Sequence, residues 1–185
     1  MKVNLGSKTY LYPMPVLIIG TYDENGNADA MNAAWGGIAD DNQINICLSP
    51  EHKTVKNLLK TKAFTVSVAD ASHVKECDYV GITSANTVPD KLEKAGFHVT
   101  KSTFVNAPVI EELGMVLECE VISYDEPTCR LLGKIVNVGV ESSLFTNDKI
   151  DVKKLDPITY DPVNHEYLRL GESVGKAFSC GKDLK

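Results

Sequence analysis

The sequence predicts a mainly β protein, a β-barrel or β-sandwich that carries a few short helices. Runs rich in Val, Ile and Leu recur along the chain at the length of single strands, as at 16–22 and 44–48. A tight-turn sequence, Asp23-Glu24-Asn25-Gly26-Asn27, follows the first of these runs. Helical spacing of apolar residues occurs only in short windows. Many short strands with few helices are typical of barrels and sandwiches.

The first part of the chain is predicted to form strands around one short helix. Four segments have the composition of strands: 16–22, the segment after the turn at 23–27, 44–48 and 64–68. The first two form a hairpin. Val55, Leu58 and Leu59 recur at helical spacing, which predicts a helix over 54–60.

Two more helices are predicted before the chain returns to strands. One covers 73–79 and the other 89–95, with Pro89 near its first turn and Gly96 at its stop position. The segment between them, 81–88, is predicted to be a loop.

The second half of the chain carries the two longest predicted strands, 114–125 and 130–140. They are joined by Glu126-Pro127-Thr128-Cys129, whose Pro and polar residues suit a turn. The Pro-containing region 156–162 is predicted to be a crossing loop.

The C-terminal segment is predicted to pack against the body of the protein. Residues 165–172 mix aromatic, aliphatic and charged side chains, and Val174 with Phe178 gives a short apolar face that needs a cover.

Composition indicates one ordinary globular domain over residues 1–185. The chain has 43% hydrophobic and 24% charged residues, enough for one buried core. Its formal net charge of -6 argues against nucleic acid or an anionic membrane as a partner, because those surfaces require clustered Lys and Arg.

The N-terminus shows no apolar segment of a signal peptide and no run long enough to span a membrane, so a cytoplasmic location is expected. The five cysteines lack the spacing of a metal site and are expected to be reduced thiols. Cys47 and Cys119 lie in apolar strand-like runs, and we interpret both as small core residues.

Two motifs point to a ligand. The run 29–37 surrounds one aromatic residue, Trp35, with Ala and Gly, which lets a planar ligand touch the backbone. Some twenty residues later, 49–57 places hydroxyl, ammonium and amide groups at a predicted helix start, which is a natural anion site. Together they predict a phosphorylated planar cofactor.

The order and spacing of these motifs resemble the flavin reductase-like family, and especially its flavoredoxin-like branch, over roughly residues 10–182. Each motif alone is weak evidence for the family, and the resemblance depends on their order and spacing together. The resemblance rests on Pro15-Val16, Gly26 before the 29–35 run, Ser49-Pro50-Glu51-His52-Lys53-Thr54 with Asn57, and Tyr167-Leu168-Arg169-Leu170-Gly171-Glu172 followed by Gly175 and Gly181.

The resemblance implies an antiparallel Greek-key split β-barrel with a few short peripheral helices, which binds FMN at the interface of a homodimer. It implies that the isoalloxazine ring touches backbone in the 32–35 segment and that the phosphate lies near Ser49, Lys53 and Thr54. The cofactor-binding residues it implies are Asn32, Ala33, Ala34, Trp35, Ser49, His52, Lys53, Thr54, Asn57, Ser84 and Lys91. No metal is implied.

Several of these residues also have an ordinary structural interpretation, and these alternatives stay open at the level of sequence. Relatives carry a Ser-Gly pair where this chain has Ser84-Ala85, a departure at a position where a backbone contact requires Gly. The alternatives are a helix N-cap for Thr54, a surface charge for Lys53, a core aromatic for Trp35, a turn-holding side chain for Asn32 and an exposed helix-start residue for His52.

With FMN bound, the flavin carries the redox chemistry and no catalytic side chain is required. Relatives that reduce free flavin carry Gly-Asp-His at the turn before the second long strand, where this chain has Thr128-Cys129. The difference favours a flavoredoxin-like electron-transfer oxidoreductase, which exchanges electrons with small-molecule or protein partners. The alternatives are an NAD(P)H:flavin reductase, which uses NADH or NADPH as donor, and a non-enzymatic binding module.

Overall fold

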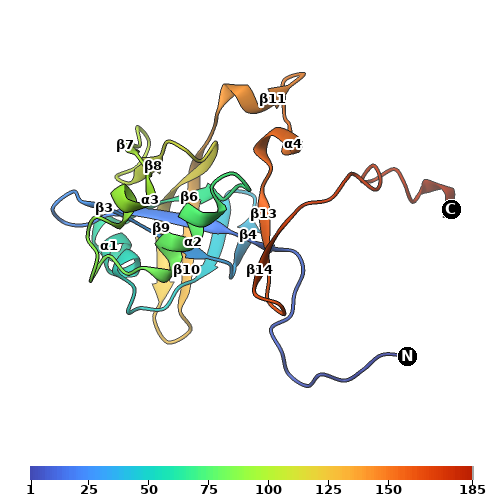
Figure 1. The fold of residues 1–185 in the computed structure, drawn as a ribbon, viewed down its shortest axis with the longest axis horizontal. Coiled ribbons are helices and arrows are strands. Elements are labelled where there is room, and N and C mark those ends of the chain that lie inside the picture. The colour runs from blue at the N-terminus through green and yellow to red at the C-terminus, as the bar shows by residue number, and fades with distance from the viewer. Residues whose placement is uncertain (185) are drawn as a thin grey trace.

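The computed structural model describes residues 1–184 and is dominated by one curled antiparallel sheet, a half-barrel (Figure 1). Its seven strands lie in the order β3-β2-β6-β9-β10-β5-β4. These are β2 (Leu17–Tyr22), β3 (Ala28–Ala33), β4 (Gly36–Asp40), β5 (Gln43–Cys47), β6 (Ala63–Val68), β9 (Met115–Asp125) and β10 (Arg130–Val140). The predicted mainly β fold class is confirmed.

Smaller sheets and short helices surround the half-barrel. The small sheets are β1 (Met14–Pro15) with β13 (Ile158–Asp161) and β14 (Glu166–Arg169), β7 (Val99–Lys101) with β8 (Pro108–Ile110), and β11 (Phe145–Thr146) with β12 (Lys149–Ile150). The helices are α1 (Lys53–Thr61), α2 (Val74–Ile82), α3 (Lys91–Ala95) and α4 (Val152–Leu155), with 3₁₀ turns η1 (Ser142–Leu144) and η2 (Lys182–Leu184).

Two apolar cores lie on opposite faces of the large sheet because side chains alternate along a strand. Strand β2 contributes to both. Ile19 joins a core that includes Leu58 of α1, and Ile18 joins a core that includes Val80 of α2. Both isoleucines are fully buried. The alternation within β2 therefore places α1 and α2 on opposite sides of the sheet.

Most predicted elements are confirmed, with small differences at their ends. Strands β2 and β3 form the predicted hairpin, and β9 pairs with β10 across the predicted turn. Helix α1 is present, and α2 continues to Ile82, so the loop begins two residues later than predicted. Helix α3 ends at Gly96, whose φ of 77° is the left-handed conformation that glycine adopts readily.

Two predictions in the C-terminal third need correction. The region 156–162 is not simply a crossing loop, because it contains β13, which pairs with both β1 and β14. The C-terminal segment packs only in part: β14 pairs with β13 and Tyr167 packs against the core, whereas Val174 and Phe178 are fully exposed. Both terminal segments extend from the body on the side of β13 and β14 (Figure 1). Within residues 1–184, no helix is both long and apolar enough to cross a membrane.

Candidate functional site

Two adjoining cavities lie between β3, the start of α1 and the end of α2. The larger, here called the aromatic cavity, has a volume of about 390 Å³. The smaller, the helix-start cavity, has a volume of about 230 Å³. Four residues line both of them: Met31, His52, Gly81 and Ile82. The cavities are therefore neighbouring parts of one site.

Strand β3 runs from one cavity to the other. Asp29 lines the helix-start cavity, Met31 lines both and Ala33 lines the aromatic cavity. Helix α2 closes the opposite wall, where a Cβ added at Gly81 would lie 2.8 Å from the Cβ of Asn32. Only glycine allows the helix to come this close to the strand without a shift.

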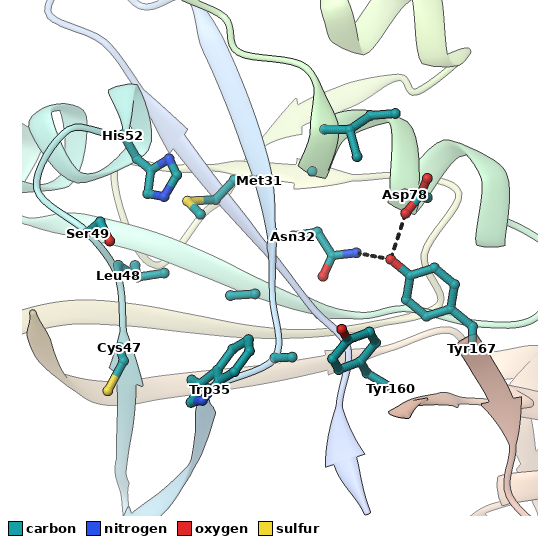
Figure 2. Close-up of a pocket in the computed structure, with 14 residues that line it drawn as sticks. Met31, Asn32, Trp35, Cys47, Leu48, Ser49, His52, Asp78, Tyr160 and Tyr167 are labelled. Atoms are coloured by element: carbon teal, nitrogen blue, oxygen red, sulfur yellow. Dashed lines mark hydrogen bonds between the residues drawn. The ribbon is translucent and has the colours of Figure 1, made fainter. Parts of the chain in front are cut away.

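The aromatic cavity combines small residues with three aromatic rings (Figure 2). Ala33 and Ala34 leave room beside the backbone. The ring centroid of Trp35 lies 6.5 Å from that of Tyr160, which lies 6.2 Å from that of Tyr167. These separations fit tilted aromatic packing. The cavity can thus hold a flat, largely apolar ring system.

A chain of hydrogen bonds crosses one wall of this cavity. The Tyr167 hydroxyl donates to Asp78 Oδ1 at 2.8 Å. The Asn32 amide nitrogen Nδ2 lies 3.3 Å from the Tyr167 oxygen and 3.2 Å from the Cys77 carbonyl oxygen. Burial, followed by the hydrogen bond to Asp78, raises the pKa of Tyr167. The phenol therefore stays protonated and remains a donor to Asp78 at neutral pH.

The helix-start cavity presents positive groups at the start of α1. Lys53 lines it, and its ammonium lies 3.8 Å from Asp23 Oδ2. The backbone N–H groups of Lys53 and Thr54, in the first turn of α1, have no hydrogen-bond partner among residues 1–184. A free first turn carries partial positive charge, so the cavity is complementary to an anion such as a phosphate.

A buried ion pair forms part of the same cavity. Asp29 is 1% exposed, and its Oδ1 lies 3.0 Å from the Lys91 ammonium. Its Oδ2 accepts a hydrogen bond from the Thr54 hydroxyl at 2.7 Å. Lys91 also donates to the carbonyl oxygens of Val80 and Thr83, near the end of α2. The charge of Lys91 is thus compensated internally, and the pair fastens α2 to β3.

The structure brings together ten of the eleven predicted site residues. Asn32, Ala33, Ala34, Trp35, Ser49 and His52 line the aromatic cavity, and His52, Lys53, Thr54, Ser84 and Lys91 line the helix-start cavity. Asn57 lines neither cavity. Its side chain is buried and donates to the Thr21 hydroxyl at 3.2 Å, so it ties α1 to β2.

Several structural alternatives are corrected or refined. The N-cap interpretation of Thr54 is wrong, because His52 holds the cap position and Thr54 lies inside the helix. The core interpretation of Trp35 is wrong, because its side chain is 49% exposed. Asn32 lies within β3 and not in a turn. His52 is exposed at the helix start, as its alternative predicts, and it also lines both cavities.

The two cysteines interpreted as core residues differ. Cys119 is fully buried, as predicted. Cys47 is exposed and lines the aromatic cavity, because it is the last residue of β5, where the buried pattern of the strand ends. All five cysteines are free thiols.

Several residues of the site are not among those predicted from the sequence. Asp29 and Met31 could have been found, because strand alternation places them on the same side of β3 as Ala33. Asp78, Gly81 and Tyr160 carry no such local signal, since they reach the cavities only through the packing of α2 and β13.

The flavin reductase-like domain model matches residues 9–162. The chain belongs to the flavin reductase-like family. It is 35% identical to the flavoredoxin of Desulfovibrio vulgaris (Miyazaki F), with a TM-score of 0.94 and 98% and 100% of the two chains covered. It is 27% identical to the flavoredoxin of Methanosarcina acetivorans, with a TM-score of 0.90 and both chains fully covered. The predicted resemblance to the flavoredoxin-like branch is confirmed.

A more distant structure agrees in fold. An FMN-binding domain of a flavin reductase-like enzyme from Shewanella baltica is 16% identical, with a TM-score of 0.79 over 88% of each chain. The predicted split-barrel fold is confirmed. A curated relative, an uncharacterized protein of Aeropyrum pernix, is 25% identical over 118 residues, and the match spans 44% of that protein's length. Together, the family and the flavoredoxin neighbours support a flavin-binding, redox-related protein.

Proposed function

We propose that this protein is an FMN-dependent oxidoreductase of the flavoredoxin type, which passes electrons through a bound FMN. One observation carries the proposal: a cavity lined by aromatic and small residues adjoins a helix start that is complementary to an anion, and both lie along β3. FMN has the matching parts, a planar ring and a terminal phosphate. The similarity over the whole chain to two flavoredoxins supports the same cofactor class.

The residues present fit FMN in size and in charge. Ala33, Ala34 and Trp35 would hold the ring, since two small side chains leave the backbone accessible beside an aromatic surface. Lys53 and the free N–H groups of the first turn of α1 would hold the phosphate. When bound, the flavin supplies the redox chemistry by accepting and releasing electrons.

The protein itself would bind and orient the cofactor and give electron donors and acceptors access to it. Cys47, Ser49 and Trp35 are exposed at the aromatic cavity, so an external electron donor or acceptor can approach this wall. The opposite wall is closed by α2 and Tyr167, which keeps water from that side. No side chain is required to act as an acid or base on a substrate.

A visible spectrum of the purified protein tests this function. We expect flavin absorption bands in the protein as isolated or after FMN is added. Anaerobic NADH, NADPH and dithionite are then added separately. Bleaching by dithionite alone supports electron transfer with other partners. Bleaching by a nicotinamide, with steady-state turnover of free FMN, instead supports an NAD(P)H:flavin reductase. A protein that binds no FMN contradicts both and leaves the binding-module alternative.

We also propose that the protein works as a homodimer in a reducing compartment. Exposed apolar residues on β4 and on the C-terminal segment, Ile38, Val174 and Phe178, support a second copy as the partner. All five cysteines are free, which fits the reducing cytoplasm. Light scattering after size exclusion measures the number of chains.

A further inference from the structure

Three polar side chains from three separate elements meet on the closed wall of the aromatic cavity (Figure 2). Asn32 comes from β3, Asp78 from α2 and Tyr167 from β14. They are linked by the hydrogen bonds from Asn32 to Tyr167 and from Tyr167 to Asp78. The cofactor's redox chemistry requires none of these groups, so their convergence needs another explanation.

The chemistry of the partners fixes which way each hydrogen bond runs. A carboxylate only accepts, so the single hydroxyl hydrogen of Tyr167 goes to Asp78. The Tyr167 oxygen must then accept from Asn32. The Cys77 carbonyl oxygen also only accepts, and it lies 3.2 Å from the same atom of Asn32. The atom of Asn32 that faces both partners is therefore the amide nitrogen.

The amide oxygen of Asn32 is left as the free atom of this side chain. Figure 2 shows it turned away from Tyr167. No hydrogen bond to it occurs within residues 1–184. Gly81 holds the backbone of α2 against the Asn32 side chain, so the amide has little room to move. The cavity thus contains an immobilised hydrogen-bond acceptor.

We propose that Asp78 and Tyr167 are positioning residues that fix Asn32, so that its amide oxygen accepts a hydrogen bond from an N–H group of the bound ring. The inference rests on the proposed function, because a flavin ring carries such N–H groups. It assigns to the wall a preference for planar heterocycles that donate a hydrogen, over flat aromatic molecules that do not.

A double-mutant cycle on FMN affinity tests the proposal. Asn32→Ala removes the acceptor and is expected to weaken FMN binding about fivefold. Tyr167→Phe releases the amide and is expected to weaken it about threefold. Because Tyr167 acts through Asn32, the double variant is expected to bind no more weakly than Asn32→Ala alone. The dissociation constants are measured by quenching of FMN fluorescence.

Tyr160→Phe provides the matched control. Tyr160 also lines the aromatic cavity and is the register partner of Tyr167, but its hydroxyl lies 2.8 Å from His165 Nδ1 and forms no hydrogen bond with Asn32. The fold-changes in the FMN dissociation constant caused by Tyr160→Phe and by Asn32→Ala are expected to multiply in the double variant. The proposal is overturned if the fold-changes caused by Tyr167→Phe and by Asn32→Ala also multiply. It is equally overturned if Tyr167→Phe leaves the affinity for FMN unchanged. Wild-type protein that binds no FMN would instead overturn the proposed function.

A second readout does not depend on the cofactor. In ligand-free wild-type protein, the side-chain NH₂ of Asn32 is expected to exchange slowly with solvent in NMR spectra, because both acceptors hold it. Tyr167→Phe and Asp78→Ala are expected to speed that exchange, while their far-ultraviolet circular dichroism stays that of the wild type. Fast exchange in the wild type would contradict the fixed amide, and a changed dichroism spectrum would identify a folding defect.

Discussion

At the scale of single residues, the site contains two lysines that play different parts. Lys91 is 3% exposed. Its ammonium group pairs with Asp29 and donates hydrogen bonds to two backbone carbonyl oxygens. Lys53 is partly exposed, and its nearest carboxylate oxygen, on Asp23, is 3.8 Å away. A charge held by a buried partner is not free for a ligand. Lys53 is therefore the lysine whose charge remains available to an anion.

Lys53→Ala is expected to weaken FMN binding by about 1–3 kcal/mol, the range for loss of a hydrogen bond to a charged group. Fluorescence titration of the apoprotein with FMN measures this. Lys60→Ala is the matched control, because Lys60 lies on the same helix but pairs with exposed Glu24 and lines neither cavity. Equal affinities for wild type and Lys53→Ala would show that the phosphate binds elsewhere.

The position of Cys47 allows a chemical test of the aromatic cavity. Cys47 is exposed and lines the cavity, whereas burial raises the pKa of Cys77 and of Cys119 to about 12. A thiol-specific alkylating reagent is expected to label Cys47 but not the two buried cysteines, since the thiolate reacts. Bound FMN is expected to slow labelling of Cys47 but not of exposed Cys180, as measured by peptide mass spectrometry. Equal protection of both would argue against FMN in this cavity.

At the scale of elements, local patterns predicted the strands, while long-range packing decided which of them reach the site. The alternation of Ile18 and Ile19 and the turn before β3 are local, so they were readable from sequence. Tyr160 and Tyr167 reach the cavity only because β13 pairs with β14 and β1. A single sequence contains no signal for that pairing, and the Pro residues near β13 favoured a loop. The sequence therefore predicts the part of the site that lies on β3 and α1, but not the part that β13 and β14 contribute.

Gly81→Ala tests the contact between α2 and β3. The added methyl would lie 2.8 Å from the Asn32 Cβ, so the helix must shift. Overpacking of this kind costs about 1–3 kcal/mol of stability. We expect a lower urea midpoint and weaker FMN binding, because the shift disturbs Asn32. Gly37→Ala is the control, since its methyl would meet nothing within 4 Å. A Gly81→Ala variant with wild-type stability and affinity would contradict this packing.

The N-terminal segment is attached to β13 through a carboxylate that depends on pH. The hydrogen bond from the Tyr12 phenol, with further ones from Asn164 and backbone N–H groups, lowers the pKa of Asp161 to about 2. Because its pKa when folded lies below its ordinary value of 3.8, Asp161 stabilises the fold above about pH 4. That contribution is lost as the pH falls through about 2.

Urea unfolding of the wild type and of Asp161→Asn at about pH 5 and about pH 2 measures this contribution. The variant is expected to lose less stability than the wild type over this range, because it has no carboxylate to protonate. Other carboxylates titrate equally in both proteins, so the difference reports Asp161 alone. The same loss in both proteins would show that this carboxylate does not contribute.

At the scale of the whole molecule, the half-barrel leaves two strands at its edges, β3 and β4. Helix α2 packs against β3. Most of β4 is exposed, and its Ile38 side chain is 69% exposed. An open edge with an exposed apolar residue is a surface that natural proteins usually cover. A single chain therefore leaves both an edge strand and an apolar terminal segment uncovered.

Pairing of two chains is the expected consequence of these uncovered surfaces. Light scattering after size exclusion is expected to give twice the mass of one chain. Full burial of an apolar side chain contributes about 1.5–3 kcal/mol, so the double variant Val174→Ser with Phe178→Ser is expected to dissociate at higher protein concentration than the wild type. Lys176→Ser, an exposed polar position on the same segment, is the control and is expected to dimerise as the wild type does. A wild-type mass of one chain at every concentration would contradict the dimer. A dimer unaffected by the double variant would place its contact on β4 instead.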